Sequence, residues 1–174
     1  GCSYPYKELS GCGVGFKLMQ AYSRIHGIPF SRIIPYLDLV AVSIASDIVP
    51  ITGENRIMAH FGLKQLNSSP RTGLREIIKE SEIRKELAVE DVVFKLGPRI
   101  NAAGRMENGS KAVDLLISED PRLAAEISRE ISSFNNERRT VDRIITTEAL
   151  RMISDDPRSA NAKTTVLYNP EWRK

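Results

Sequence analysis

The sequence lacks the features that would indicate secretion, a membrane protein or a zinc site. It contains no apolar run of about 18 residues and no charged segment followed by an apolar one at its start, so it predicts neither a membrane-spanning helix nor a signal peptide. Cys2 and Cys12 are too few for a disulfide framework, and no Cys or His residues have the spacing of zinc ligands. We therefore expect a cytoplasmic protein with reduced thiols.

The sequence also has little excess charge of either sign. Its formal net charge is +3, and 27% of its 174 residues are charged while 41% are hydrophobic. These values are ordinary for a globular protein and argue against intrinsic disorder. The slight excess of basic residues permits a polyanion as partner, but by itself it does not indicate nucleic acid.

A short, nearly continuous apolar segment predicts a buried strand. It covers residues 37–45, reads LDLVAVSIA and is rich in Val and Ile, as expected for a strand that is covered on both faces of a parallel sheet. An amphipathic helix is expected before it, between Gly11 and His26, with Ser10 as N-cap and Gly27 as stop. Together these patterns predict an α/β fold.

The longest expected element is a helix from Pro121 to about Ser154. Pro121 suits the first helical turn, Asp120 suits the N-cap, and apolar residues follow in alternating steps of three and four. At about 1.5 Å per residue such a helix is roughly 50 Å long, so we expect it to connect two domains. A strand is expected at 164–168, with too few residues after it to supply a partner strand.

Both ends of the sequence predict that it is part of a longer protein. It opens with Gly1 rather than Met, and it closes at Lys174 directly after the expected strand. We therefore expect three parts. These are the C-terminal half of a parallel-sheet domain at 1–118, a connecting helix and loop at 119–156, and the first strand of a truncated second domain at 157–174.

Asp47 directly follows the expected strand at 37–45. Ligands of open parallel sheets bind beyond the carboxyl ends of the strands. A carboxylate there suits Mg²⁺ or Mn²⁺, which prefer oxygen ligands and can activate water for attack on a phosphodiester. The alternative is that Asp47 only caps the next turn through its side-chain oxygen. Asp38, inside the expected strand, is interpreted as a hydrogen-bonded structural carboxylate.

A second candidate site is the segment 97–105, which reads GPRINAAGR and is expected to be a loop between two helices. Its small residues would let a substrate approach the backbone, and the guanidinium of Arg99 or Arg105 can bind phosphate through two hydrogen bonds. Asn101 lies between the two arginines. The alternative is a loop that only connects the helices.

Three further patterns are less specific. Residues 10–15 read SGCGVG, but no strand pattern precedes them and their spacing differs from that of a dinucleotide-binding loop, so close packing of the helix against a sheet explains the glycines as well. His26 and His60 have no partner at ligand spacing, and no site is assigned to them. Three polar residues of the long helix are compatible with solvent, interdomain or nucleic-acid contacts: Asn135, Arg138 and Arg139.

Three strings of the sequence resemble, in the same order, successive segments of the single-strand-specific DNA exonucleases of the DHH phosphoesterase family. They read SGCGVGFKLMQAY, LDLVAVSIASDIVPITGENRIMAHFGLKQLN and FKLGPRINAAGRMENGSKAVDLL. In addition, NNERR resembles the family's connecting-helix motif, and TTVLYNPEW resembles the start of its second, DHH-associated domain. The resemblance implies the C-terminal half of a DHH-type domain, a connecting helix and the start of that second domain.

The resemblance also implies a function and site residues. It implies degradation of single-stranded DNA from the 5′ end, in DNA repair and recombination, with two Mn²⁺ or Mg²⁺ ions held by aspartates and histidines. Asp47 stands in SDIVP, where the family usually reads ADVVP, and matches its last metal-binding aspartate. Arg105 matches a position associated with the phosphate end of the substrate, and Asn101 accompanies it; Arg99 remains a candidate from the composition of the segment. The metal and phosphate interpretations are therefore favoured.

One departure from the family limits this expectation. The sequence contains no DxD and no Asp-His-His triplet, and a two-metal site needs several such ligands. We therefore expect the longer protein to be the enzyme and this chain alone to be inactive. The alternatives are another DHH phosphoesterase, acting on short oligonucleotides or cyclic dinucleotides, and a non-catalytic scaffold that binds nucleic acid. The long helix favours the exonuclease.

Overall fold

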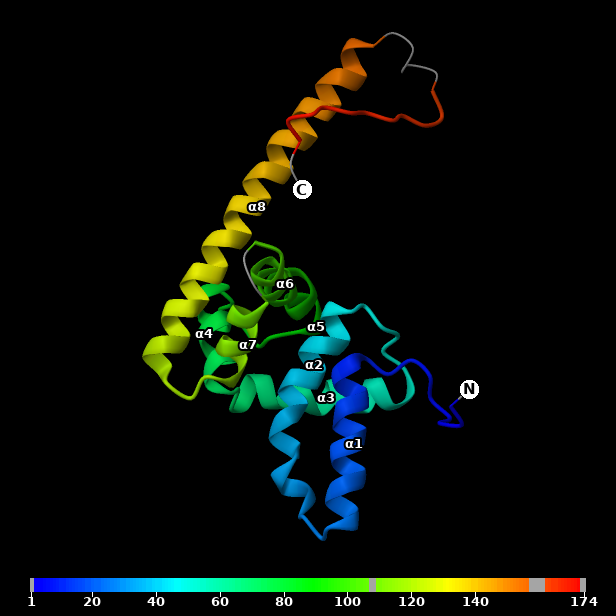
Figure 1. The fold of residues 1–174 in the computed structure, drawn as a ribbon, viewed down its shortest axis with the longest axis vertical. Coiled ribbons are helices and arrows are strands. Elements are labelled where there is room, and N and C mark those ends of the chain that lie inside the picture. The colour runs from blue at the N-terminus through cyan, green and yellow to red at the C-terminus, as the bar shows by residue number, and fades with distance from the viewer. Residues whose placement is uncertain (1, 107–108, 157–161, 173–174) are drawn as a thin grey trace. The chain divides into compact units, whose positions relative to one another are not determined.

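The computed structural model describes residues 2–106, 109–156 and 162–172, without the side chains of 104–106, and every regular element in these ranges is helical (Figure 1). The elements are α1 (Gly11–Ile25), the 3₁₀ turns η1 (Phe30–Arg32) and η2 (Ile34–Tyr36), α2 (Leu37–Ser46), α3 (Gly53–Ser68), α4 (Thr72–Glu80), α5 (Val89–Asp91), the π-helical turn η3 (Val92–Leu96), α6 (Gly97–Met106), α7 (Ser110–Ile117) and α8 (Pro121–Asp155).

The expected α/β fold with a parallel sheet is wrong for the described residues. The segment expected as a buried strand at 37–45 is helix α2, and it is almost entirely apolar because it is buried on nearly all sides. A helix buried all round shows no amphipathic period, so a short apolar run of this kind cannot be distinguished from a buried strand by periodicity. Helix α2 takes the central place that the sheet was expected to occupy.

Two hydrophobic clusters meet at α2. Val40 and Ile44 belong to a cluster with residues of α1 and α3, among them Phe16 and Met58. The other side of α2 contributes to a second, larger cluster with side chains from α3, α4, α6, α7 and the first part of α8. In Figure 1, α1 lies beside α2 and α3 crosses both, which agrees with the contacts between these helices. One buried helix therefore joins both halves of the core.

The crossing of α2 and α3 depends on Gly62. A Cβ atom at this position would lie 2.2 Å from the backbone oxygen of Leu37 and 2.5 Å from the Cβ of Ala41. Real Cβ atoms do not approach other atoms so closely, so the two helices can touch backbone to backbone only because this residue has no side chain. The small residues at this crossing set the distance between α2 and α3.

The segment 97–105, expected as a loop, is also helical. It forms most of α6, which continues from α5 through the π-helical turn η3. The N–H of Gly97 donates to the carbonyl of Val92, five residues earlier, and Pro98 has no N–H to continue the regular pattern. Ala102 and Ala103 are buried, so the small residues that suggested an open loop instead allow close helix packing.

The chain divides by its contacts into two compact units, residues 1–134 and 135–174. In the first unit, the expected start of α8 is confirmed: Asp120 accepts a hydrogen bond from the N–H of Arg122 (2.8 Å), and Pro121 begins the helix. The helix continues to Asp155, as the apolar pattern predicted. The expected division at 118/119 and 156/157, and the role of α8 as a connector between domains, stay predictions.

The second unit is held together by Glu148 of α8. Its carboxylate accepts hydrogen bonds from the amide of Asn169 (2.8 Å) and the indole N–H of Trp172 (2.8 Å). No strand is present at 164–168 or elsewhere among residues 162–172, and Val166 is 95% exposed. The expected strand is therefore wrong for these residues, since there is no neighbouring strand to pair with. None of the helices in the described part of the chain combines the length and hydropathy that a membrane crossing needs.

Asp91 fixes the start of the helical segment that leads into α6. It is buried, and its carboxylate accepts hydrogen bonds from the ammonium of Lys95 (2.8 Å) and from the N–H of Ala88 (3.2 Å), while the ammonium of Lys85 lies 3.7 Å away. The hydrogen bond from Lys95, followed by that from Ala88, lowers the pKa of Asp91 below its ordinary value of 3.8, although desolvation acts in the opposite direction.

We expect Asp91→Asn to remove part of the acid sensitivity of the fold. Because the pKa of Asp91 is lower in the folded than in the unfolded chain, its ionised form stabilises the fold above the unfolded pKa, and this stabilisation is lost as the pH falls through the folded pKa. Urea unfolding from about pH 6 down to about pH 3 measures the effect. The free energy of unfolding of the wild type should exceed that of the variant at the upper pH, and the two values should approach each other in acid. An equal difference at all pH values would contradict the assignment.

Candidate functional site

Asp47 lies at the C-terminal end of helix α2. Its N–H donates to the carbonyl of Ser43 (2.9 Å), and its Oδ2 accepts a hydrogen bond from the Ser43 hydroxyl (3.0 Å). Its Oδ1 accepts no hydrogen bond within the described part of the chain, and the residue is exposed. One carboxylate oxygen is therefore fixed and the other is available to a ligand.

The position of Asp47 favours a cation. The carboxylate was expected beyond the end of a strand but stands beyond the end of a helix, where the last carbonyl groups carry the negative end of the helix dipole. A carboxylate is mildly unfavourable at this end, whereas a cation is attracted by the carboxylate and the carbonyls together. The Asp47 side chain bonds back to Ser43, in the last turn of α2, and not to the turn that follows, and this single hydrogen bond leaves Oδ1 unused.

The described residues do not form a complete metal site around Asp47. No group of three or more His, Cys, Asp or Glu residues that could hold an ion occurs in the part of the chain that the structure describes. An exposed carboxylate with an uncommitted oxygen fits one ligand position of Mg²⁺ or Mn²⁺, and further ligands have to come from elsewhere. His26 stacks on Tyr22, and His60 contacts Phe61 edge to face, so both imidazoles lie in aromatic contacts.

The start of α6 lies beside the end of α2 that carries Asp47. A Cβ atom on Gly97 would lie 2.7 Å from the Ser46 hydroxyl oxygen, which shows how closely the two helices approach here. The structure therefore brings the first residue of the segment 97–105 to Ser46, the neighbour of Asp47. Only a glycine fits at this contact without moving the neighbouring residue.

The three predicted phosphate-binding residues are arranged by the turns of α6. Arg99 is half-buried and donates from its guanidinium to the carbonyl of Lys95 (2.7 Å), whereas Asn101 is exposed. The side chain of Arg105 lies outside the described residues. Its backbone is four positions after Asn101 on the same helix, so these two residues share a face, while Arg99 is two positions before Asn101 and points elsewhere. The helix therefore separates Arg99 from the other two.

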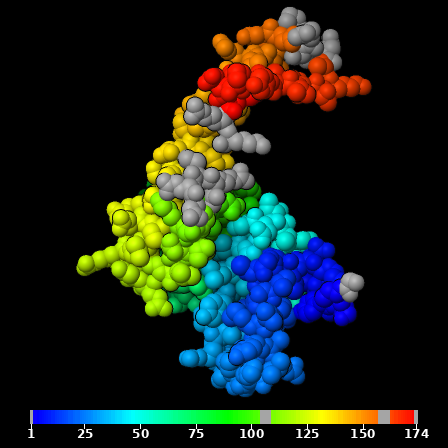
Figure 2. Space-filling view, viewed as in Figure 1, coloured from blue at the N-terminus to red at the C-terminus, as the bar shows by residue number. Residues whose placement is uncertain are grey.

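An N-terminal strap, residues 2–10, was not identified from the sequence. Its Tyr6 hydroxyl lies within hydrogen-bond distance of the carbonyl oxygens of Thr52 (2.9 Å) and Pro50 (3.3 Å). The amide of the fully buried Asn55 donates to the carbonyls of Glu8 (2.6 Å) and Pro50 (3.0 Å). In Figure 2 the dark-blue N-terminal residues lie against the cyan residues that follow α2. The strap thus covers the segment directly after Asp47.

Ser10 ends the strap and begins α1. Its hydroxyl oxygen accepts a hydrogen bond from the N–H of Gly13 (3.2 Å), which confirms the predicted N-cap. A Cβ atom on Gly13 would lie 3.3 Å from the hydroxyl oxygen of Ser10 and at the ordinary contact distance of 3.5 Å from Met58 of α3, whereas Gly11 and Gly15 face open space. The expected close packing against a sheet is therefore not observed for these glycines, and the neighbour of Gly13 is helix α3.

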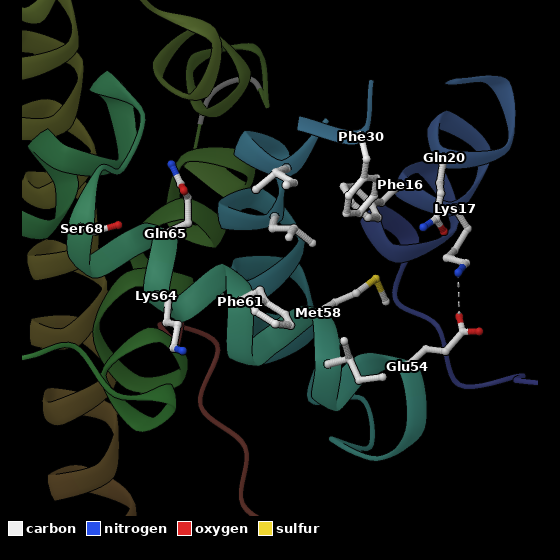
Figure 3. Close-up of a pocket in the computed structure, with 13 residues that line it drawn as sticks. Phe16, Lys17, Gln20, Phe30, Glu54, Met58, Phe61, Lys64, Gln65 and Ser68 are labelled. Atoms are coloured by element: carbon white, nitrogen blue, oxygen red, sulfur yellow. Dashed lines mark ion pairs between the residues drawn. The ribbon is translucent and has the colours of Figure 1, made fainter. Parts of the chain in front are cut away.

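A pocket of about 500 Å³ lies away from these residues, between α1, α3 and the turns η1 and η2. Figure 3 shows Phe16 and Phe30 together at one end and Phe61 near Lys64 farther along α3, with the Lys17–Glu54 ion pair (3.5 Å) on the rim. Asp47, Arg99 and Asn101 do not line it. The candidate site therefore lies at the end of α2, outside this pocket.

The sequence of the chain is similar to curated exonucleases. It is 43% identical to the "Single-stranded-DNA-specific exonuclease RecJ" of Bacillus subtilis over 88% of this chain, and 31% identical to the RecJ of Escherichia coli over 99% of this chain. A crystal structure titled "exonuclease RecJ bound to manganese" superimposes with a TM-score of 0.77 at 30% identity and covers 86% of this chain. The chain belongs to the RecJ family.

Membership of the RecJ family confirms the resemblance to single-strand-specific DNA exonucleases. A RecJ structure from Thermus thermophilus in complex with Mg²⁺ also matches, with a TM-score of 0.76 over 84% of this chain and 23% of that chain. The chain spans 19% of the Bacillus and 32% of the Escherichia protein, and 38% of the manganese-bound chain. No family model matches the sequence.

Proposed function

We propose that this chain forms part of the catalytic core of a metal-dependent exonuclease that degrades single-stranded DNA in the 5′ to 3′ direction. The observation that carries the proposal is the carboxylate of Asp47, with one oxygen fixed by Ser43 and the other uncommitted, in a RecJ chain. Two RecJ structures that match it contain Mg²⁺ or Mn²⁺. The Asp47→Asn variant of the full-length protein, assayed for metal-dependent release of nucleotides, tests the proposal.

Asp47 would bind one of the metal ions of a two-metal site. Bound Mn²⁺ or Mg²⁺ activates water and stabilises the charge that develops on the phosphodiester. The part that this chain performs is to hold the carboxylate: α2 places it at its negative end, and the Ser43 hydroxyl fixes its orientation. Chelation of divalent ions by EDTA should accordingly abolish nucleotide release.

We further propose that α6 binds the phosphate groups of the DNA through Arg105, with Asn101 on the same face and Arg99 one half-turn away. An arginine suits this role because its guanidinium can donate two parallel hydrogen bonds to one phosphate. The small residues of α6 and its closeness to the end of α2 would bring a phosphate held there near Asp47. Acting on DNA, such a bacterial-type exonuclease would work in the cytoplasm, in DNA repair and recombination.

Arg105→Ala in the full-length protein should weaken binding to single-stranded DNA and reduce its salt dependence. Each phosphate that the protein contacts releases about one counterion from the DNA on binding. Without the Arg105 contact one counterion fewer is released, so the slope of log affinity against log salt should become flatter by roughly 0.7. Fluorescence anisotropy with a labelled oligonucleotide over a salt series measures this slope. Arg105→Lys keeps the charge but should still weaken binding, because an ammonium cannot make the paired contact.

The exposed Arg84, between α4 and α5, gives a matched control. Arg84→Ala removes the same charge from outside α6 and should leave the slope of the salt series unchanged. If Arg105→Ala leaves the slope unchanged but strongly lowers the thermal stability, Arg105 supports the fold and does not bind DNA.

A further inference from the structure

The turn that follows Asp47 is strained. Ile48 has φ of 53°, in the left-handed region that residues with a Cβ atom rarely adopt and that is least favourable for a β-branched residue. This turn ends α2 and sets the direction in which the chain leaves Asp47. Strained residues of this kind persist only where the surrounding structure holds them in place.

The side chain of Ile48 does not hold the turn. It is 79% exposed, so no burial of apolar surface offsets the strained backbone. The turn must therefore be fixed by the backbone on either side of it. On the N-terminal side this is done by α2, whose last turn includes the hydrogen bond from the N–H of Asp47 to the carbonyl of Ser43 (2.9 Å).

On the C-terminal side the turn is held by two side chains, the buried Asn55, whose amide donates to the carbonyl of Pro50 (3.0 Å), and Tyr6 of the strap. The Tyr6 hydroxyl lies 2.9 Å from the carbonyl oxygen and 3.2 Å from the hydroxyl oxygen of Thr52, and 3.3 Å from the carbonyl oxygen of Pro50. Its ring packs on the backbone of Gly53, where a Cβ atom would lie 2.8 Å from the ring. Tyr6 thus holds the residues at which the Asp47 loop, residues 47–52, joins α3, while Asn55 holds Pro50 within the loop.

We infer that Tyr6 is a positioning residue for Asp47. By holding the distal end of the Asp47 loop, it keeps Ile48 in its strained conformation and so keeps the free Oδ1 of Asp47 in the orientation in which it binds the metal ion. This inference rests on the proposed function, because it assigns to Tyr6 an effect on the ion that Asp47 is proposed to bind. Tyr6 itself touches neither the ion nor the DNA.

The test compares two variants of the full-length protein, Tyr6→Phe and Tyr4→Phe. Both remove one hydroxyl from the strap, but the Tyr4 hydroxyl bonds to the carboxylate of Glu54 in α3 (2.8 and 2.9 Å) and not to the Asp47 loop. Titration calorimetry with Mn²⁺, in the absence of DNA, measures the affinity for the ion. Tyr6→Phe should weaken the affinity for Mn²⁺ about tenfold, which is the smallest effect expected for a residue that orients a metal ligand. Tyr4→Phe should leave the affinity unchanged.

Two further measurements separate positioning from general stability. The Mn²⁺ concentration for half-maximal nucleotide release should rise by the same factor in Tyr6→Phe, while the rate at saturating Mn²⁺ stays near that of the wild type. A lower thermal midpoint with unchanged Mn²⁺ affinity would overturn the inference. If Tyr6→Phe does not fold, Thr52→Val, which removes the hydroxyl that lies 3.2 Å from that of Tyr6, must still weaken Mn²⁺ binding, and unchanged affinity there overturns the inference as well.

Asp47→Asn distinguishes failure of this inference from failure of the proposed function. If Asp47→Asn weakens Mn²⁺ binding and Tyr6→Phe does not, only the positioning role of Tyr6 is wrong. If neither variant changes the affinity, Asp47 does not bind the ion and both proposals are wrong.

Discussion

Asp47→Asn in the full-length protein is expected to lower metal-dependent turnover on single-stranded DNA by about a thousandfold, because loss of one ligand charge removes roughly 4 kcal/mol of transition-state stabilisation. The asparagine oxygen can still accept the hydrogen bond from Ser43, so the end of α2 should keep its structure. Release of nucleotides from a 5′-labelled oligonucleotide, measured over a series of Mn²⁺ concentrations, gives both the rate and the apparent affinity for the metal.

Asp114→Asn is the matched control for this experiment. Asp114 is an exposed carboxylate on α7, so the substitution removes the same charge away from the end of α2 and should leave turnover unchanged. Thermal unfolding of both variants shows whether the fold is kept. If Asp47→Asn matches the wild type in rate and in Mn²⁺ affinity, the aspartate is only a turn residue, and the hydrogen bond with Ser43 is its whole role.

The local features of the fold could be predicted from the sequence. Ser10 at the start of α1 and Asp120 at the start of α8 accept the hydrogen bonds that were expected of N-caps, and α8 runs close to the predicted length. These features depend on residues within one or two turns of each other, so a short stretch of sequence contains the information that determines them.

The fold class could not be predicted, because the decisive segment is ambiguous. Residues 37–45 are almost entirely apolar, which suits a strand in a parallel sheet and equally a helix that is buried all round. What distinguishes them is the position of Gly62, which lets α3 lie directly on the backbone of α2. This contact joins Gly62 to Leu37 and Ala41, which lie more than 20 positions earlier in the chain, and no local pattern indicates it.

The candidate site shows the same division between local and distant information. Asp47 was identified because it follows a segment expected to be a strand, and the resemblance of its SDIVP context favoured it. Its place at the end of a helix and the helical form of 97–105 were not predicted. The strap was missed because the contact of Tyr6 with Thr52 spans 46 positions. The positive φ of Ile48 could not be expected either, since isoleucine is among the residues least suited to it.

Asp38→Ala is expected to lower the free energy of unfolding of the chain by about 3 kcal/mol. Asp38 is 1% exposed and accepts hydrogen bonds from Arg71 through its backbone N–H (3.2 Å), Nε (2.9 Å) and a terminal nitrogen (2.8 Å), and from the N–H of Leu39 (2.7 Å). Arg71 also packs over the Tyr36 ring, 5.4 Å from its centroid. Removal of one partner of a buried pair costs about 3–5 kcal/mol, and the lower end applies because the Arg71 side chain is 20% exposed and can reach water.

The physical cause of this loss can be separated from that of a simple cavity by replacing both partners. If the main cost is the guanidinium that is left unpaired, then Asp38→Leu combined with Arg71→Met should be more stable than Asp38→Ala, because no charge is left buried. Asp142→Ala, which breaks the exposed Arg138–Asp142 pair (2.9 Å) of α8, serves as the surface control and should cost at most about 0.5 kcal/mol. Urea unfolding at constant pH gives all three values. If Asp38→Ala and Asp142→Ala lower the free energy of unfolding equally, the Asp38–Arg71 pair does not hold α4 to α2. If the double variant is no more stable than Asp38→Ala, the loss is caused by packing and not by an unpaired charge.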